Sequence, residues 1–465
     1  MFSYSTICAP ATSGAGAISI IRLSGPDSFK IAGSIFRSSG NKKINELKPY
    51  SIHLGEILDG SEVLDEVIVS IFKSPHSYTG EDSIEISCHA SPFIQKRILE
   101  LLVENGALLA GPGEFTQRAF LNGKMDLSQA EAVADLIASE NKSAHRIALN
   151  QMRGGFSKEL AQLRKELLHF TSMIELELDF SEEDVEFANR DALYGLVTNM
   201  LKVITRLIES FKSGNVIKNG VPVAIIGKPN VGKSSLLNRL LNDDKAIVSE
   251  IPGTTRDSIE DTIRIGDITF RFIDTAGIRE TADIIENLGI RKTYQKIEQA
   301  AVILLLADAR DSTEIILESF QEIRNQIKNQ EKQLVLVMNK SDMTKTSQLS
   351  ELKTSLNLNE NENLVEISAK KGTNIDQLDQ ILIKAAKVSN LDKDAVIVSN
   401  IRHFEALSLA FENLNRVKEG ISNNIPSDLI SQDLRQAIYY LGQITGEIST
   451  DEVLGNIFRN FCIGK

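Results

Sequence analysis

The segment Gly227–Ser235, "GKPNVGKSS", restricts the fold of this chain more than any other feature. It follows the apolar run "VPVAIIG" and leads into "SSLLNRLL", which has helical character. A strand, a glycine-rich turn ending in Lys-Ser and a helix together form a phosphate-binding loop. The glycines let backbone N–H groups turn toward phosphates at the positive end of the helix. We expect Lys233 to reach the β- and γ-phosphates and the Ser234 hydroxyl to bind Mg²⁺.

The region that follows alternates strands with helices. Strands are predicted at "TFRFIDT", "AVILLLAD" and "LVLVMN", and a helix is predicted at "NIDQLDQILIKAAK". This alternation predicts a doubly wound, mostly parallel sheet.

Two further motifs select the base of the nucleotide. In "NKSD", the Asp342 carboxylate can accept hydrogen bonds from the N1–H and the exocyclic amine of guanine, which adenine does not offer. Asn339 and the stem of Lys340 are expected to frame the base. In "SAK", Ser368 to Lys370, a backbone N–H is expected to meet the guanine oxygen. Their order on alternating elements predicts GTP binding.

The segments "IPGTTRD" and "FIDTAGIRE" have the pattern of the two switches of a GTPase. Thr255 is the hydroxyl expected to close onto Mg²⁺ when the γ-phosphate is present. Asp274 is expected near Mg²⁺, with the Gly277 amide on the γ-phosphate. Ile278 stands where Ras-like switches carry a glutamine that orients the attacking water.

Because the aliphatic side chain of Ile278 cannot hydrogen-bond to a water, other groups must orient the attacking water. Asn230 could coordinate a monovalent cation together with carbonyls of the first switch, in place of an arginine finger. Glu286 could orient the water, although the residues alone also allow a solvated helix position there. The expected GTP-binding positions are Asn230, Val231, Gly232, Lys233, Ser234, Ser235, Ser249, Glu250, Ile251, Pro252, Gly253, Thr254, Thr255, Asp274, Thr275, Ala276, Gly277, Asn339, Lys340, Asp342, Ser368, Ala369 and Lys370.

Three compositional zones divide the chain. Up to about Gly123, β-rich stretches and one helix, "FIQKRILELLVENGA", predict a compact α+β domain. Apolar stripes from Leu127 to Phe211 predict helices that pack on one another. The turn-rich "KSGNVIKNG" is expected to be a linker to the nucleotide domain, and helical periodicity returns after about Val388. The two helical stretches are either halves of one domain with an insertion or two separate bundles.

Composition limits the class of protein. The chain has 465 residues, 42% of them hydrophobic, a net charge of −12 and three cysteines. An odd number of distant cysteines predicts a reduced, cytoplasmic protein without a disulfide framework. We expect neither a signal peptide nor a membrane span, because the apolar runs are too short. Since the whole protein repels polyanions, a nucleic-acid contact needs a local basic patch or a partner's surface.

Two further segments are distinctive: "GPGEFTQRAFLNGKMDLSQAEAVADLI" and the terminal "FCIGK". Together with the GTPase motifs, they resemble the MnmE (TrmE) family of bacterial tRNA-modification GTPases. The resemblance covers essentially the whole chain. It implies an α+β N-terminal domain, an all-α helical domain and an inserted α/β Ras-like P-loop GTPase domain. The implied boundaries are residues 1–122 for a folate-binding and dimerisation domain, 123–217 and 388–465 for the two parts of the helical domain, and 218–387 for the G domain.

The resemblance also implies the activity. Such a protein is a potassium-stimulated GTPase that forms a homodimer and joins an FAD-dependent partner, MnmG, in a heterotetramer. Together they install a carboxymethylaminomethyl-type group on carbon five of the wobble uridine of tRNAs, using a tetrahydrofolate one-carbon unit. Glu286 would orient the water through a bridging water. The implied Mg²⁺ ligands are Ser234 and Thr255, and the implied K⁺ ligands are Asn230, Ser249, Ile251 and Thr254.

Four positions match the family's folate contacts: Arg22, Glu81, Lys124 and Lys465. The ligand would be 5-formyl- or methylene-tetrahydrofolate, with a carboxylate on the pterin edge and cations on the glutamate tail. Cys462 is either a buried inert thiol or a thiol near the one-carbon unit, where Lys465 would favour the thiolate. With Glu286 and Lys233 it completes the candidate catalytic residues.

Two other functions compete with this one. The first is a ribosome-assembly GTPase switch without covalent chemistry, although the chain has one phosphate loop and is acidic overall. The second is a folate-dependent one-carbon transferase with a purely regulatory G domain.

Overall fold

The computed structural model describes the whole chain except residues 1–4, 13–15, 180–189, 243–260, 274–296, 328–331, 345–348 and 387–395, together with Asn41, Asn460 and Lys465. The chain divides into two compact units. The first comprises residues 1–138, 148–200 and 409–465, and the second comprises residues 139–147 and 201–408. The expected domain boundaries at residues 122, 217 and 387 stay predictions.

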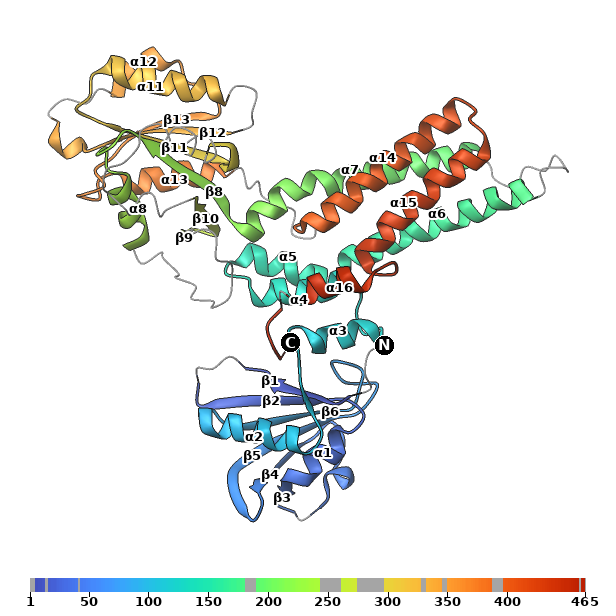
Figure 1. Cartoon of the computed structure of the whole chain (residues 1–465). Coiled ribbons are helices and arrows are strands. Elements are labelled where there is room, and N and C mark those ends of the chain that lie inside the picture. Colours follow the sequence, from blue (N-terminus) through green and yellow to red (C-terminus); the bar gives the residue numbers. More distant parts are fainter. Residues whose placement is uncertain are drawn as a thin grey trace. The chain divides into compact units, whose positions relative to one another are not determined.

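Seven strands of the first unit form a sheet in the order β3-β4-β5-β6-β2-β1-β7 (Figure 1). Neighbouring strands are antiparallel except β1 and β7, which run parallel. The strands are β1 (Ile7–Pro10), β2 (Ile18–Ser24), β3 (Phe36–Ser38), β4 (Ile52–Asp59), β5 (Glu62–Phe72), β6 (Ser83–His89) and β7 (Leu108–Leu109). The predicted α+β character of this region is confirmed.

Helices cover one face of this sheet. Inward-facing residues such as Leu23 and Ile84 are fully buried in one cluster with Ile98 and Leu102. Alternate residues of the strands point to the opposite face of the sheet, where Leu54 of β4 is exposed. The helical elements are α1 (Ser28–Ile35), the short 3₁₀ helix η1 (Ile44–Glu46) and α2 (Pro92–Glu104). The sequence predicted α2 but not α1, because eight residues give a short periodic signal.

Long helices make up most of the remaining first unit. The expected stripe on α6 is confirmed, since Leu160, Leu167 and Ile174 are buried. The helices of this unit are α3 (Glu114–Leu121), α4 (Leu127–Ile137), α6 (Gly155–Asp179), α15 (Ser427–Thr445) and α16 (Asp451–Phe458). Helices α5 (Lys142–Met152), α7 (Arg190–Asn219) and α14 (Ile401–Ser422) contribute residues to both units. Among the described helices, none has the length and apolarity needed to cross a membrane.

The second unit contains a six-stranded sheet in the order β13-β12-β11-β8-β10-β9. All neighbours are parallel except β9, which is antiparallel to β10. The strands are β8 (Val221–Gly227), β9 (Asp261–Ile265), β10 (Ile268–Phe272), β11 (Val302–Asp308), β12 (Gln333–Asn339) and β13 (Glu362–Glu366). The helices are α8 (Lys233–Asn242), α11 (Thr313–Gln326), the 3₁₀ turn η2 (Ser341–Met343), α12 (Leu349–Leu356) and α13 (Ile375–Ala385).

Helices cover both faces of this sheet, as predicted. Residues of α8 and α13, including Leu236 and Leu378, pack in one buried cluster, and α11 and α12 contribute Phe320 and Leu352 to another. The parallel register aligns the strand ends, because Leu306 is opposite Gly227 and Asp308 is opposite Asn339. All the predicted nucleotide motifs of the described chain therefore follow strands at one edge of the sheet.

The expectation of a turn-rich linker at "KSGNVIKNG" is wrong. Helix α7 continues to Asn219, one residue before Gly220. Gly214 lies inside this helix, where an added Cβ would come within 2.1 Å of the Val398 carbonyl oxygen. The glycine therefore permits a close approach of two backbones and does not mark a turn.

Two glycines of α7 should respond oppositely to replacement by alanine. Gly195→Ala should stabilise the protein by about 0.5–1 kcal/mol, because no atom lies within 4 Å of the added Cβ and alanine favours helices. Gly214→Ala should destabilise it by about 1–3 kcal/mol, because the Cβ collides with Val398. Thermal unfolding of both variants measures this, and stabilisation by both would contradict the packing of residues 396–400 on α7.

Candidate functional site

The phosphate-binding loop joins β8 to α8. Its first glycine, Gly227, has φ +146°, and a Cβ there would lie 2.4 Å from the Leu306 carbonyl oxygen. Gly232 has φ +99°, and a Cβ there would lie 2.3 Å from Asn339 Nδ2. Both positions therefore require glycine for conformation and for space.

Lys233, the first residue of α8, folds back over this loop. Its Nζ donates to the carbonyl oxygens of Gly227 and Lys228, each at 2.9 Å. The ammonium group thus sits on the backbone of the loop, at the positive end of α8. Ser234 follows in the first helical turn and is half-buried. This combination of a helix N-terminus, a lysine and a hydroxyl fits a phosphate with its magnesium ion.

Asn339 connects the loop with the third motif. Its side chain is buried, donating from Nδ2 to the Val231 carbonyl oxygen at 2.9 Å and accepting at Oδ1 from the Ala369 N–H at 3.0 Å. Asn339 therefore bridges two backbone segments. It also lines the cavity beside them, and its expected place next to a base stays a prediction. The amide meets both partners because it carries one donor and one acceptor.

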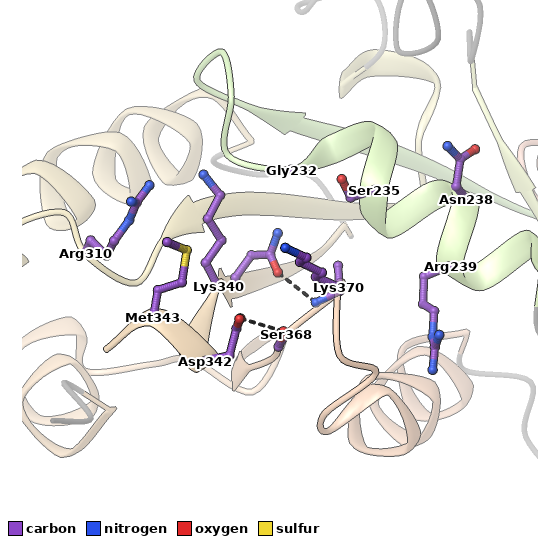
Figure 2. Close-up of a pocket in the computed structure, with 12 residues that line it drawn as sticks. Gly232, Ser235, Asn238, Arg239, Arg310, Lys340, Asp342, Met343, Ser368 and Lys370 are labelled. Carbon is purple, nitrogen blue, oxygen red and sulfur yellow. Dashed lines mark hydrogen bonds between the residues drawn. The ribbon is translucent and has the colours of Figure 1, made fainter. Parts of the chain in front are cut away.

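A cavity of about 660 Å³ opens beside these segments, and Figure 2 shows the residues that line it. Asp342 Oδ1 accepts a hydrogen bond from the Ser368 hydroxyl at 2.6 Å. This bond, assisted by Lys371 and Lys370, lowers the pKa of Asp342. The group is therefore an ionised acceptor at neutral pH, which suits the two adjacent N–H donors of guanine. Lining residues are Gly232, Ser235, Asn238, Arg239, Arg310, Asn339, Lys340, Asp342, Met343, Ser368, Ala369 and Lys370.

Sequence reasoning missed Arg310, which lines this cavity, and Asp308, which contacts two of the lining side chains. The guanidinium of Arg310 binds both oxygens of the Asp308 carboxylate, and Lys340 Nζ binds Oδ2 at 2.8 Å. The available signal was an aspartate closing the apolar run "VILLLAD". A charged residue that ends a parallel strand lies at the ligand edge of the sheet.

Several predicted residues lie outside the described part of the chain. They are Ser249, Glu250, Ile251, Pro252, Gly253, Thr254, Thr255, Asp274, Thr275, Ala276, Gly277, Glu286 and Lys465. Of the potassium ligands implied by the resemblance, Asn230 is described. It is exposed and has φ +63°.

A second polar cluster lies in the first unit around Arg22 on β2. Its Nε donates to Glu85 Oε1 at 2.9 Å, and its Nη1 donates to the Gly464 carbonyl oxygen at 3.4 Å. The guanidinium also lies 5.3 Å from the ring centroid of Tyr78 and 5.6 Å from that of Phe115. Arg22 is therefore a half-buried cation close to two aromatic rings and is not an ordinary surface charge.

Glu81 and Lys124 lie near each other beside this cluster. Ser24, two residues after Arg22 on β2, donates to Glu81 Oε2 at 2.8 Å, and Arg118 donates to Oε1 at 3.2 Å. Lys124 is exposed and donates to the Pro75 carbonyl oxygen, and its stem lies 3.3 Å from a Cβ added at Gly80. Arg118 was not predicted from the sequence.

The chain's last described residues join the same region. Ile463 forms a bridge with Pro112, and a Cβ added at Gly464 would lie 1.9 Å from the Pro10 carbonyl oxygen. Gly464 has φ +93°, so both its conformation and its surroundings require glycine. Cys462 is exposed, which overturns the interpretation as a buried inert thiol.

Comparison with known proteins covers nearly the whole chain. The "GTP-binding protein TrmE N-terminus" family matches residues 6–124, and the "MnmE helical domain" family matches residues 127–462. The tRNA modification GTPase MnmE of Bacteroides thetaiotaomicron is 55% identical over 463 residues, which is 99% of each chain. The protein of that name from Flavobacterium psychrophilum is 52% identical over 469 residues, which is 100% of each. A crystal structure of Aquifex aeolicus Era matches 41% of this chain and 66% of its own at 30% identity, with a TM-score of 0.28.

The three thiols should differ sharply in reactivity. Burial raises the pKa of Cys8 and of Cys88 to about 11, so both stay protonated and inaccessible, whereas Cys462 is exposed. An alkylating reagent at about pH 8 should modify one thiol per native chain and all three after denaturation. Cys462→Ser should remove the fast reaction. Fast modification of Cys8 or Cys88 in the native chain, read by peptide mass spectrometry, would contradict the described core.

Proposed function

This chain belongs to the MnmE (TrmE) family of tRNA modification GTPases, and from that premise we propose that it hydrolyses GTP in a potassium-stimulated cycle that drives wobble-uridine modification with a tetrahydrofolate one-carbon unit. GTP hydrolysis in tRNA modification follows from the family itself. The observation that carries the rest of the G-domain proposal is the cavity in which Asp342 is held by Ser368.

We assign the nucleotide contacts from this cavity and the adjoining loop. The base would lie against Asp342, with the Ala369 N–H and the Lys340 stem beside it, and the phosphates would lie along Asn230 to Ser235. An ATP base would leave the ionised Asp342 carboxylate without its donors, which costs about 1–3 kcal/mol per unpaired group and selects GTP. Lys233 would exchange its two carbonyl contacts for phosphate oxygens.

The metal ions are assigned through ligand chemistry. The hydroxyls of Ser234 and Thr255 would hold Mg²⁺, which neutralises charge on the phosphates when bound. The Asn230 side chain and oxygens of Ser249, Ile251 and Thr254 would hold K⁺. These are oxygen ligands, as a hard monovalent cation requires. A backbone carbonyl ligand at position 249 does not depend on the side chain that the residue carries. Glu286 would orient the attacking water through a second water.

The folate site is proposed at the cluster around Arg22. A pterin ring needs a carboxylate for its donor edge and flat surfaces for stacking, and Glu81 and Tyr78 supply these groups. Lys124 and Lys465 would meet the carboxylates of the glutamate tail. The exposed Cys462, next to the segment that contacts Arg22, would lie near the one-carbon unit.

We also propose that the N-terminal sheet mediates a homodimer. The sheet face opposite α1 and α2 exposes Ile52, Leu54 and Ile68, with 71%, 61% and 44% of their surface accessible. Leu54 and Ile68 are direct partners across β4 and β5, so the apolar surface is continuous over two strands. Such a face is expected to be covered by a second copy.

The remaining partners follow from family membership. We propose that the dimer joins an FAD-dependent MnmG partner in a heterotetramer in the cytoplasm and that tRNA is the substrate of the assembly. A net charge of −12 favours a tRNA surface supplied at least partly by the partner. The two competing functions, a ribosome-assembly switch and a one-carbon transferase with a regulatory G domain, are separated by the tRNA nucleosides of a complemented deletion strain.

GTP turnover should depend on potassium. We expect turnover in K⁺ to exceed that in Na⁺ by about 10-fold or more, because the cation replaces an arginine finger. Glu286→Ala should lower kcat about 100-fold while the affinity for a fluorescent GDP stays the same. Glu298→Ala, an exposed carboxylate, is the control and should leave turnover unchanged. Equal rates in both salts would refute the potassium proposal.

Loss of the gene should remove aminomethyl-type wobble uridines from tRNA, as read by nucleoside mass spectrometry. Wild type and the exposed-carboxylate control Glu62→Gln should restore them, whereas Lys233→Ala and Glu81→Gln should not. Restoration by Lys233→Ala would favour a regulatory G domain. Unchanged nucleosides in the deletion strain would favour ribosome assembly, and restoration by Glu81→Gln would move the folate site elsewhere.

A further inference from the structure

Asp308 ends β11 directly opposite Asn339 at the end of β12. Its side chain is 9% exposed, and both carboxylate oxygens are occupied. Oδ1 accepts from the Arg310 backbone N–H at 3.0 Å and from Arg310 Nε at 2.9 Å. Oδ2 accepts from Arg310 Nη2 at 2.6 Å and from Lys340 Nζ at 2.8 Å. Asp308 is therefore an aspartate fixed by two cations at the ligand edge of the sheet.

Lys340 connects Asp308 to the phosphate-binding loop. Its Nζ also donates to the Asn230 carbonyl oxygen at 2.6 Å. Lys340 and Asn230 both have left-handed backbone conformations, with φ of +67° and +63°. Such conformations are unfavourable for residues other than glycine unless surrounding contacts hold them. The contacts from Asp308 to Lys340 and from Lys340 to Asn230 provide that restraint.

We infer that Asp308 is a positioning residue for GTP turnover, because it anchors the Lys340 ammonium group and thereby fixes both the stem beside the base and the Asn230 backbone. This inference rests on the proposed function, in which the Asn230 side chain binds K⁺. It assigns Asp308 a role that connects the base pocket with the cation site, without contact to GTP itself.

A simple electrostatic role predicts the opposite result. Asp308, Arg310 and Lys340 together carry a net charge of +1, so neutralising Asp308 makes the site more positive and would strengthen attraction for a nucleotide phosphate. If Asp308 positions Lys340, neutralisation instead releases the ammonium group and weakens binding. The sign of the change therefore separates the two roles.

The experiment compares Asp308→Asn with Asp311→Asn in the full-length chain. Asp311 lies three residues further on and makes no side-chain contact with Lys340 among the described interactions. For Asp308→Asn we expect about tenfold weaker binding of a fluorescent GDP and an about tenfold higher K⁺ concentration for half-maximal GTP turnover. Preference for GTP over ATP should be retained, because Ser368 continues to hold Asp342. Asp311→Asn should behave as wild type.

A double-mutant cycle tests whether Asp308 acts through Lys340. In a Lys340→Met background, Asp308→Asn should change GDP affinity less than about twofold, since its contact is already lost. If Asp308→Asn does not fold, Asp308→Glu is the alternative variant, because it keeps the negative charge but moves it. For Asp308→Glu we expect the same weaker GDP binding and the same higher K⁺ concentration for half-maximal GTP turnover.

Three results would overturn the inference. They are tighter GDP binding by Asp308→Asn, behaviour equal to that of Asp311→Asn, and an undiminished effect in the Lys340→Met background. A wild-type chain that K⁺ does not stimulate would refute the potassium part of the proposed function instead. The GDP affinities of the double-mutant cycle would then decide the role of Asp308 by themselves.

Discussion

The nucleotide site depends on one buried amide. Asn339 is joined to Val231, 108 positions earlier, and to Ala369, 30 positions later, so it holds the phosphate-binding loop against the "SAK" segment. A buried amide left without these partners would cost about 1–3 kcal/mol for each group. The close approach exists because Gly232 has no Cβ. The loop, the strand end and the "SAK" segment therefore have to be assembled together.

The sequence predicted the strand, loop and helix of the phosphate-binding segment, because its determinants are local. A phosphate-binding loop is a continuous segment, and its glycines, lysine and serine fix its backbone and its chemistry together. The alternation of strands and helices predicted a mostly parallel sheet, and the structure shows that "NKSD" and "SAK" follow strands at the same edge as the loop. Asp308 escaped prediction because its importance comes from the parallel register with Asn339, which no local pattern contains. The sequence also did not predict that α7 continues to Asn219. Gly214 is needed there because the Val398 backbone approaches it closely, and its neighbours in sequence give no sign of this contact.

The polar cluster around Arg22 had even less local signal. Its partners Glu85 and Gly464 are 63 and 442 positions away, and both are invisible to periodicity or spacing. Family resemblance selected Arg22 and Glu81, but it did not identify Arg118, whose side chain is 10% exposed and joins Glu81 to Glu114. Burial of a paired arginine requires satisfied partners on several elements, so only the folded chain reveals which charges belong together.

Backbone strain at the nucleotide site shows what the contacts between Asp308, Lys340 and Asn230 achieve. Asn230 and Lys340 each adopt a left-handed conformation, which costs most residues other than glycine about 1–2 kcal/mol and asparagine less. Glycine would relieve this strain at both positions but would remove a polar side chain from each. The two residues stabilise each other through one short hydrogen bond, and Asp308 neutralises the lysine that makes it. The apolar clusters on both faces of the sheet fix the strands, whereas the conformation of the ligand edge is determined by these charged contacts.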